Sequence, residues 1–229
     1  MMLEAHDLVK YYDHRPVLNG ASIAVKDGET RVIIGLNGSG KSTLLKAITG
    51  VIKIDMGVIK IDEKDVTNLP PEDRNVGYVP QHPSLFNHLT IEDNISYSLK
   101  NGRGSKEAFA NVVSLLGLEK YLLMRPGELS GGYKCRVSLA RAIMSRPRVL
   151  LLDEPMTEVD RAKKEQLLPT FKDVLGEFSI PVIYITHDPW EAGMIGNTYS
   201  IMDNGKIASI GSPEEAFRMI REQALHNMI

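Results

Sequence analysis

The chain has 229 residues, of which 43% are hydrophobic and 24% charged, enough to build a core for one large domain or for a domain with an inserted lobe. A formal net charge of −2 gives no sign of a polyanionic partner, so we expect no nucleic acid to bind. The single cysteine, Cys135, excludes an internal disulfide and fits a reducing compartment. No apolar run approaches the roughly 20 residues of a membrane span, and no signal peptide is recognisable, so we expect a cytosolic chain that reaches a membrane only through a partner.

Short strands are predicted for most of the N-terminal part of the chain. Residues 2–12 and 17–29 show partial alternation of apolar and polar residues, and the second segment ends at a Lys-Asp-Gly-Glu turn. Further strands are predicted at 30–35 and 76–79, and residues 57–66 are predicted to form a strand followed by a polar turn. Between them, the segment KSTLLKAIT has apolar positions at helical spacing and stops at a glycine, which predicts a helix.

Helical patterns begin in the second part of the chain. The predicted elements are, in order, helices at 90–99 and 106–118, a helix opening at Ser130, a buried parallel strand in PRVLLLDEP, a helix at 160–178, a strand in PVIYITHD, a hairpin with an Asn-Gly turn at 198–211 and a helix after Ser212. Strands that alternate with helices predict an α/β fold with a mainly parallel sheet.

A phosphate-binding loop is predicted between the strand at 30–35 and the helix after it. The segment GLNGSGKST matches G-x-x-x-x-G-K-[S/T], whose glycines let the backbone N–H groups surround a phosphate. Lys41 is expected to reach the β- and γ-phosphates, and Ser42 to bind Mg²⁺. The candidate nucleotide-binding residues of this loop are Gly35, Asn37, Gly38, Ser39, Gly40, Lys41, Ser42 and Thr43.

Three later strands end in polar residues that should meet at the same sheet edge. After VLLL, Asp153 is a candidate Mg²⁺ ligand, and Glu154 is a candidate general base for an attacking water, although adjacent acids can also form an ordinary turn. His187 is a candidate contact for a γ-phosphate. Gln81 could touch Mg²⁺ or the water. A histidine at a strand end usually has no such role, so that interpretation depends on the other motifs.

A second anion site is predicted far from the phosphate loop. Ser130, Gly131 and Gly132 open a helix with a capping hydroxyl followed by backbone that no side chain covers. The chain's own phosphate loop does not obviously use this site.

Along essentially its whole length, the chain resembles the nucleotide-binding subunit of ATP-binding cassette (ABC) transporters. The resemblance rests on the order of its motifs: the phosphate loop, Gln81, LSGGY, LLLDEP, Asp160 and His187. The LSGG signature is lacking in other P-loop proteins, kinases included. The resemblance implies an α/β fold with a P-loop NTPase core, an N-terminal antiparallel β subdomain and an inserted α-helical lobe. It implies one domain, with residues 1–83 and 128–229 as the RecA-like core with its β subdomain and residues 84–127 as the lobe.

In this family two cassettes pack head to tail around ATP. The resemblance therefore implies that Ser130, Gly131 and Gly132 face the γ-phosphate of ATP bound to the partner chain. It implies that Tyr12 stacks on adenine, with packing on the strand face as the alternative, and that Asp160 lies in the dimer-interface loop. Glu154 corresponds to the catalytic glutamate and His187 to the switch histidine.

Three residues depart from the family pattern. Tyr133 stands where Gln is common, which puts that residue's contacts to the partner's nucleotide in doubt, although the anion site should persist. Glu158 adds a charge near the expected interface, and Leu36 replaces a frequent Pro with little expected effect.

The segment 69–95 resembles the importer branch that serves oxyanions, sugars and polyamines, and the compact form is similar to molybdate or tungstate importer subunits. The chain ends soon after Gly211, so we expect the C-terminal regulatory domain of this branch to be absent. Leu85, Phe86 and Leu89 are expected either to receive a coupling helix of the membrane subunit or to pack the helical lobe.

The sequence therefore predicts an ATP-hydrolysing importer subunit that uses ATP and Mg²⁺. Its expected partners are a second, identical cassette, integral membrane permease subunits and a substrate-binding protein, at the cytoplasmic face of the cell membrane. The alternative is a soluble cassette ATPase of an assembly complex, of the iron–sulfur biogenesis type, which shares every ATP motif. Nucleic-acid machines of this superfamily usually carry two cassettes or a long coiled coil, and the sequence shows neither.

Overall fold

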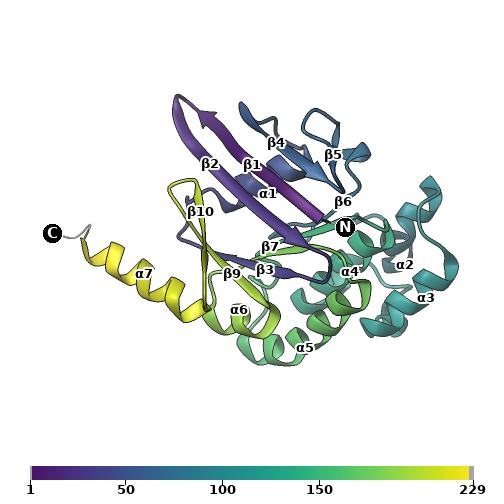
Figure 1. Ribbon diagram of the computed structural model, residues 1–229. Coiled ribbons are helices and arrows are strands. Elements are labelled where there is room, and N and C mark those ends of the chain that lie inside the picture. Colours follow the sequence, from purple (N-terminus) through teal and green to yellow (C-terminus); the bar gives the residue numbers. More distant parts are fainter. Residues whose placement is uncertain (1, 227–229) are drawn as a thin grey trace.

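A computed structural model describes residues 2–226 (Figure 1). Within these residues the strands form two sheets. The antiparallel sheet has the order β2-β1-β4-β5, with β1 (Met2–Tyr12), β2 (Arg15–Lys26), β4 (Met56–Ile61) and β5 (Lys64–Asp65). The mainly parallel sheet has the order β10-β9-β3-β8-β7-β6, with β3 (Thr30–Ile34), β6 (Val76–Val79), β7 (Val149–Asp153), β8 (Val182–Ile185), β9 (Thr198–Asp203) and β10 (Lys206–Ile210).

The parallel pairing brings the ends of several strands to one edge. Strand β3 pairs in parallel with β8 and β9, and β7 pairs in parallel with β6 and β8, whereas β10 closes the sheet as an antiparallel hairpin with β9. Every residue of β7 and β8 is buried, as a sheet covered on both faces requires. The segments that follow β3, β6, β7 and β8 therefore start from the same side of the molecule.

The helices cover this sheet and extend the fold to one side (Figure 1). They are α1 (Lys41–Thr49), α2 (Ile91–Ile95), α3 (Lys106–Leu115), α4 (Gly131–Met144), α5 (Arg161–Phe178), α6 (Pro189–Ile195) and α7 (Pro213–His226), with 3₁₀ turns at Pro71–Asp73, Ser96–Asn101, Glu119–Tyr121 and Pro126–Glu128. Within residues 2–226, none of these helices is both long enough and apolar enough to cross a bilayer.

One apolar cluster joins the α2–α3 region to the sheet. Ile91 of α2 and Val112 of α3 belong to the same buried cluster as Val32 of β3 and Leu152 of β7, and α4 packs against both α2 and α3. The helical region expected from the sequence is therefore present. The boundaries at residues 84 and 127 stay a prediction.

Helix α1 has the bounds predicted from its sequence. Gly40 precedes it with a φ of 107°, and Gly50 ends it with a φ of 80°. Its last turn is capped by the Arg74 side chain, which is 4% exposed and donates to the carbonyls of Ala47 and Ile48 at 2.8 and 3.1 Å. A cation at this end of a helix is favoured by the helix dipole.

Three parts of the fold differ from the predicted elements. The helix expected at 90–99 is α2 followed by the 3₁₀ turn Ser96–Asn101. Residues 57–66 were expected to be one strand and a polar turn, but they form the β4–β5 hairpin, whose turn residues Asp62 and Glu63 have φ values of 50° and 65°. Helix α6 was not predicted. It spans Pro189–Ile195, too few residues to show a helical periodicity, and Asp188 caps it by accepting a bond from Trp190 N at 2.9 Å.

Candidate active site

The loop between β3 and α1 is shaped by close backbone contacts. A Cβ atom at Gly35 would lie 2.3 Å from the Met202 carbonyl oxygen, and one at Gly40 would lie 2.6 Å from that of Val17. The Ser39 carbonyl accepts a bond from Gly205 N, in the β9–β10 turn, at 3.1 Å. The loop is therefore held from both sides in the form that the sequence motif predicts.

Lys41 is folded into this loop. It is 5% exposed, and its Nζ donates to the carbonyls of Gly35 and Leu36 at 2.8 and 2.9 Å. Burial lowers the pKa of Lys41, and the nearby carboxylates of Glu154 and Asp153 oppose that shift. The ammonium group thus sits at the inner wall of the loop, where the same donors can serve phosphate oxygens.

Ser42 and Asp153 meet where α1 starts and β7 ends. The Ser42 hydroxyl donates to Asp153 Oδ1 at 3.1 Å, and the Tyr78 hydroxyl donates to Oδ2 at 3.1 Å. Burial raises the pKa of Asp153, and these two hydrogen bonds oppose the shift. A hydroxyl next to a carboxylate is a donor set that fits Mg²⁺, which prefers a few oxygen ligands together with phosphate oxygens and water.

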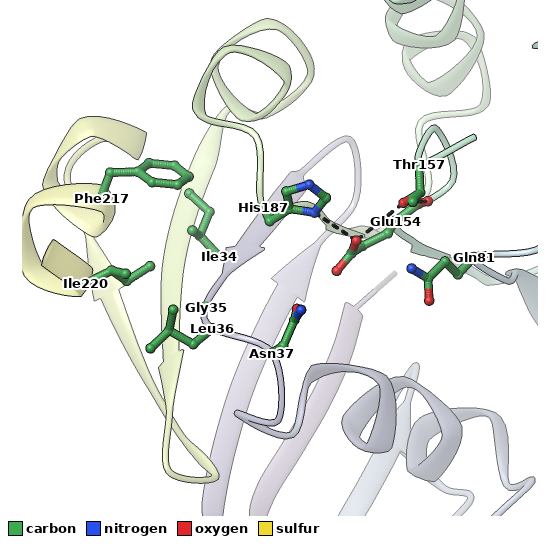
Figure 2. A pocket seen from close by; sticks show the side chains of 10 residues that line it. All are labelled: Ile34, Gly35, Leu36, Asn37, Gln81, Glu154, Thr157, His187, Phe217 and Ile220. Carbon is green, nitrogen blue, oxygen red and sulfur yellow. Dashed lines mark hydrogen bonds and ion pairs between the residues drawn. The ribbon is translucent and has the colours of Figure 1, made fainter. Parts of the chain in front are cut away.

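Glu154 and His187 form a pair beside the loop (Figure 2). His187 Nδ1 is hydrogen-bonded to Glu154 Oε2 at 2.8 Å. The Thr157 hydroxyl is 2.9 Å from the Glu154 carbonyl oxygen and 3.3 Å from Oε2, and it can donate to either. Glu154 has a φ of 45°, unusual for a residue with a side chain, and its N–H donates to the Ile185 carbonyl at 3.1 Å. The strand end β7 is thereby tied to β8, directly before His187.

Two adjoining pockets bring most of the predicted site residues together. The larger has a volume of about 620 Å³ and is shown in Figure 2. It is lined by Ile34, Gly35, Leu36, Asn37, Gln81, Glu154, Thr157, His187, Phe217 and Ile220. The smaller, of about 300 Å³, is lined by Val17, Asn37, Gly38, Gly40, Lys41, Ser42, Thr43, Gln81 and Glu154. Asn37, Gln81 and Glu154 line both pockets, so the two pockets meet between the phosphate loop and the pair of Glu154 and His187.

The second predicted anion site lies outside both pockets. Ser130 is exposed at the N-cap of α4, and its side chain makes no capping hydrogen bond. A Cβ atom at Gly131 would lie 2.9 Å from the Glu158 carbonyl oxygen, so this glycine allows close packing of the segment after β7. Gly132 and the start of α4 thus leave their N–H groups without a cap from Ser130.

Asp160 and Tyr12 also lie outside these two pockets. Asp160 caps α5 by accepting a bond from Lys163 N at 3.1 Å, and its carboxylate is paired with Lys163 Nζ at 2.7 Å. Tyr12 ends β1, is 46% exposed, and has Lys10 Nζ 5.6 Å from its ring centre. The ring is therefore only partly covered, and its role in stacking on adenine stays a prediction.

Sequence reasoning did not identify several residues that shape the site. Tyr78 and Thr157 bond to the two acids, and Phe217 and Ile220 of α7 give the larger pocket an apolar wall beside Leu36. Tyr78 carries a signal that could have been used, since it lies in the strand that precedes Gln81 and pairs with Leu151, two residues before Asp153. The α7 residues come from a distant part of the chain and carry no such signal.

Comparison with known proteins identifies the family. The family described as "ABC transporter" matches residues 18–157. The chain is 37% identical over 212 residues to the spermidine/putrescine import ATP-binding protein of Thermotoga maritima, covering 91% of this chain and 58% of that protein. It is 40% identical over 188 residues to the molybdate/tungstate import ATP-binding protein of Archaeoglobus fulgidus, covering 81% and 78%.

Solved structures agree with this assignment. A nucleotide-free ATP-binding cassette from an ABC transporter superposes with a TM-score of 0.84 at 27% identity, covering 96% of this chain and 95% of the other. A dimeric cassette in a post-hydrolysis state with ADP and Pi gives a TM-score of 0.80 at 25% identity, covering 92% and 98%. From its sequence, its fold and the residues gathered at its sheet edge, the chain belongs to the ABC transporter family.

Proposed function

We propose that the chain hydrolyses ATP as the motor subunit of an importer. The observation that carries this proposal is the pair of Glu154 and His187, 2.8 Å apart, at the mouth of the phosphate loop. A buried lysine and a serine–carboxylate pair stand in the same pocket region, so that phosphate binding, Mg²⁺ binding and proton transfer can take place together.

The loop residues would hold the phosphates of ATP. Lys41 would exchange its two carbonyl partners for β- and γ-phosphate oxygens, while backbone N–H groups at the start of α1 face the same anion. Ser42, Asp153 and Gln81 are the residues that fit Mg²⁺. The ion would neutralise charge that develops on the phosphate oxygens.

Glu154 is the proposed general base. Its carboxylate can accept the proton of an attacking water, and His187, bonded to Oε2, holds that carboxylate and can contact the γ-phosphate. Gln81, which lines both pockets, would sense whether the γ-phosphate is present. Most of the rate acceleration in such transfers comes from positioning and from charge neutralisation.

A second copy of the chain would complete each site. Ser130, Gly131 and Gly132 of one copy would face the γ-phosphate bound to the other, which gives the uncapped start of α4 an anion to bind. Tyr12 would stack on adenine, and Asp160 would lie at the contact between the copies. Two ATP molecules would thus join two cassettes, and their hydrolysis would release them.

The names of the relatives favour import over the assembly-complex alternative. Both relatives described above are named import ATP-binding proteins, although the chain spans only 58% of the first. On this proposal the chain binds membrane permease subunits, works with a substrate-binding protein and acts at the cytoplasmic face of the membrane. Leu85 is buried in the core cluster and packs the helical region, so Phe86 and Leu89, which are half-buried, are the better candidates for a permease contact.

Purification of the tagged chain from detergent-solubilised membranes tests the transport part of the proposal. We expect a multi-span membrane protein to co-purify in equal amount, and Glu154→Gln, which should hold ATP without hydrolysing it, to increase its yield in the presence of ATP. Recovery of soluble assembly proteins instead would favour the iron–sulfur type of ATPase and would leave the ATP-site assignments unchanged.

A further inference from the structure

A buried carboxylate lies behind the site, outside both pockets. Glu191 is 2% exposed and belongs to α6, four residues after His187. Each of its oxygens has a partner: Oε1 accepts a bond from the Tyr184 hydroxyl, and Oε2 is 3.0 Å from Lys164 Nζ. The Lys164 side chain is itself only 12% exposed.

These partners belong to the segments that carry the candidate catalytic residues. Tyr184 lies on β8, three residues before His187, so its bond to Glu191 spans the His187 loop from one side to the other. Lys164 lies in the first turn of α5, the helix that starts directly after Asp160. The Asp160 carbonyl accepts the Lys164 N–H at 2.9 Å. The three side chains therefore connect the loop after β8 with the start of α5.

A third segment reaches the same place from α4. Cys135 is buried, and its thiol donates to the Pro155 carbonyl at 3.0 Å, next to Glu154. Burial, followed by the charge of Glu191, raises the pKa of this thiol and that of the Tyr184 hydroxyl, so both groups keep their protons and act as donors. The segment after β7 is thus held against the helix that begins at Ser130.

Stability alone does not explain a buried ion pair at this position. Burying two charges costs free energy that their attraction only partly returns, and apolar side chains of similar size often serve equally well. The geometry points to Glu191 as a positioning residue: bound to Tyr184 and Lys164, it fixes the His187 loop to the start of α5 and keeps His187 within hydrogen-bond reach of Glu154. This inference rests on the proposed roles of Glu154 and His187.

The decisive variant neutralises the pair without leaving a charge unpaired. In Lys164→Met/Glu191→Gln, the glutamine can still bond to the Tyr184 hydroxyl, while the connection to α5 is lost. We expect an unfolding temperature close to that of the wild type, a kcat lower by roughly 10-fold to 100-fold, and a KM for ATP within about twofold of wild type. Lys172→Met, which removes an exposed lysine from the same helix, is the matched control and should keep wild-type kcat.

The loss should depend on His187. When the double change is made in a His187→Ala background, we expect kcat to fall by less than about twofold, because no imidazole is left to position. An equal loss in both backgrounds would show a general structural role and overturn the inference, as would wild-type kcat in the double variant. If His187→Ala itself has wild-type kcat, the proposed function of His187 fails together with the inference. If the double variant does not fold, Lys164→Met is compared in the same two backgrounds below its unfolding temperature.

Trp190 supplies a readout that does not depend on catalysis. It is the single tryptophan of the chain, it lies in α6 next to Glu191, and Arg161 at the start of α5 is 5.1 Å from its ring centre. We expect the double variant to shift its fluorescence to longer wavelength, since α6 and α5 separate and the ring becomes more exposed. An unchanged spectrum would show that the pair does not hold these two helices together.

Discussion

Arg74 provides a quantitative test of how the phosphate loop is held. Besides Ala47 and Ile48 at the end of α1, its guanidinium donates to the carbonyls of Leu69 at 2.8 Å and Thr67 at 2.7 Å. Burial lowers the pKa of Arg74, and the negative charge of Asp65 opposes that shift. The side chain therefore joins the helix after the phosphate loop to the segment that leads into β6.

Replacing Arg74 with Met should remove these four bonds while keeping much of the apolar packing. Three buried carbonyls, those of Ile48, Leu69 and Thr67, would lose this donor, whereas the Ala47 carbonyl would keep the Gly50 N–H at 3.1 Å. At roughly 1 kcal/mol for each unpaired carbonyl, the cost is about 3 kcal/mol in total. We therefore expect Arg74→Met to lower the free energy of unfolding by about 3 kcal/mol. For a chain of this size, that lowers the unfolding temperature by about 6–12 °C. Because α1 carries Lys41 and Ser42, we also expect weaker ATP binding.

Thermal unfolding and equilibrium binding of ATP measure the two effects. The matched control is Arg103→Met, because Arg103 is exposed and donates one bond, to the Glu72 carbonyl at 2.8 Å. We expect Arg103→Met to change the free energy of unfolding by no more than about 0.5 kcal/mol. If Arg74→Met is no less stable than Arg103→Met, the capping argument is wrong. If it is less stable but binds ATP normally, Arg74 supports the fold without shaping the loop.

Three further changes test the site itself. Glu154→Gln should bind ATP while phosphate release slows by roughly 10²- to 10⁴-fold, and near-normal steady-state release would exclude Glu154 as the general base. Ser130→Arg should leave ATP binding to the isolated chain intact yet abolish hydrolysis by homodimers, so full activity would contradict the shared site. Asp153→Asn should stabilise the nucleotide-free protein near neutral pH. Burial raises the folded-state pKa of Asp153, so the wild type loses stability as the pH rises through that pKa, whereas the asparagine variant has no such group to ionise. The gain should vanish in acid, where Asp153 is protonated in both states, and unfolding temperatures across this pH range give the answer.

Local signals predicted the elements that begin and end at distinctive residues. The bounds of α1 were predicted because Gly40 and Gly50 flank an apolar helical pattern, and the β9–β10 hairpin was predicted from Asn204 and Gly205, both of which have positive φ. Helix α6 has only seven residues and was missed. The sequence pattern was therefore sufficient where turn residues mark the end of an element. It failed for a helix that has too few residues to show a helical repeat of apolar positions.

The candidate site was predictable in its residue types but not in its contacts. Each strand-end residue proposed from the sequence lies at the expected edge, because parallel pairing alone brings such ends together. The bond from Tyr184 to Glu191 and the capping of α1 by Arg74 could not be predicted. Those contacts depend on side chains that meet only after the sheet and helices have packed.

Tyr133, which departs from the family pattern, makes two contacts beside the second predicted anion site. Its ring centre is 4.1 Å from that of Tyr121, and the Arg136 guanidinium is 5.1 Å from the same ring. The side chain is thus engaged with two residues of its own chain. In the proposed dimer, anion binding at the start of α4 would then depend on the Ser130 hydroxyl and the backbone N–H groups. We therefore expect Tyr133→Gln to change ATP binding between the two copies far less than Ser130→Arg does.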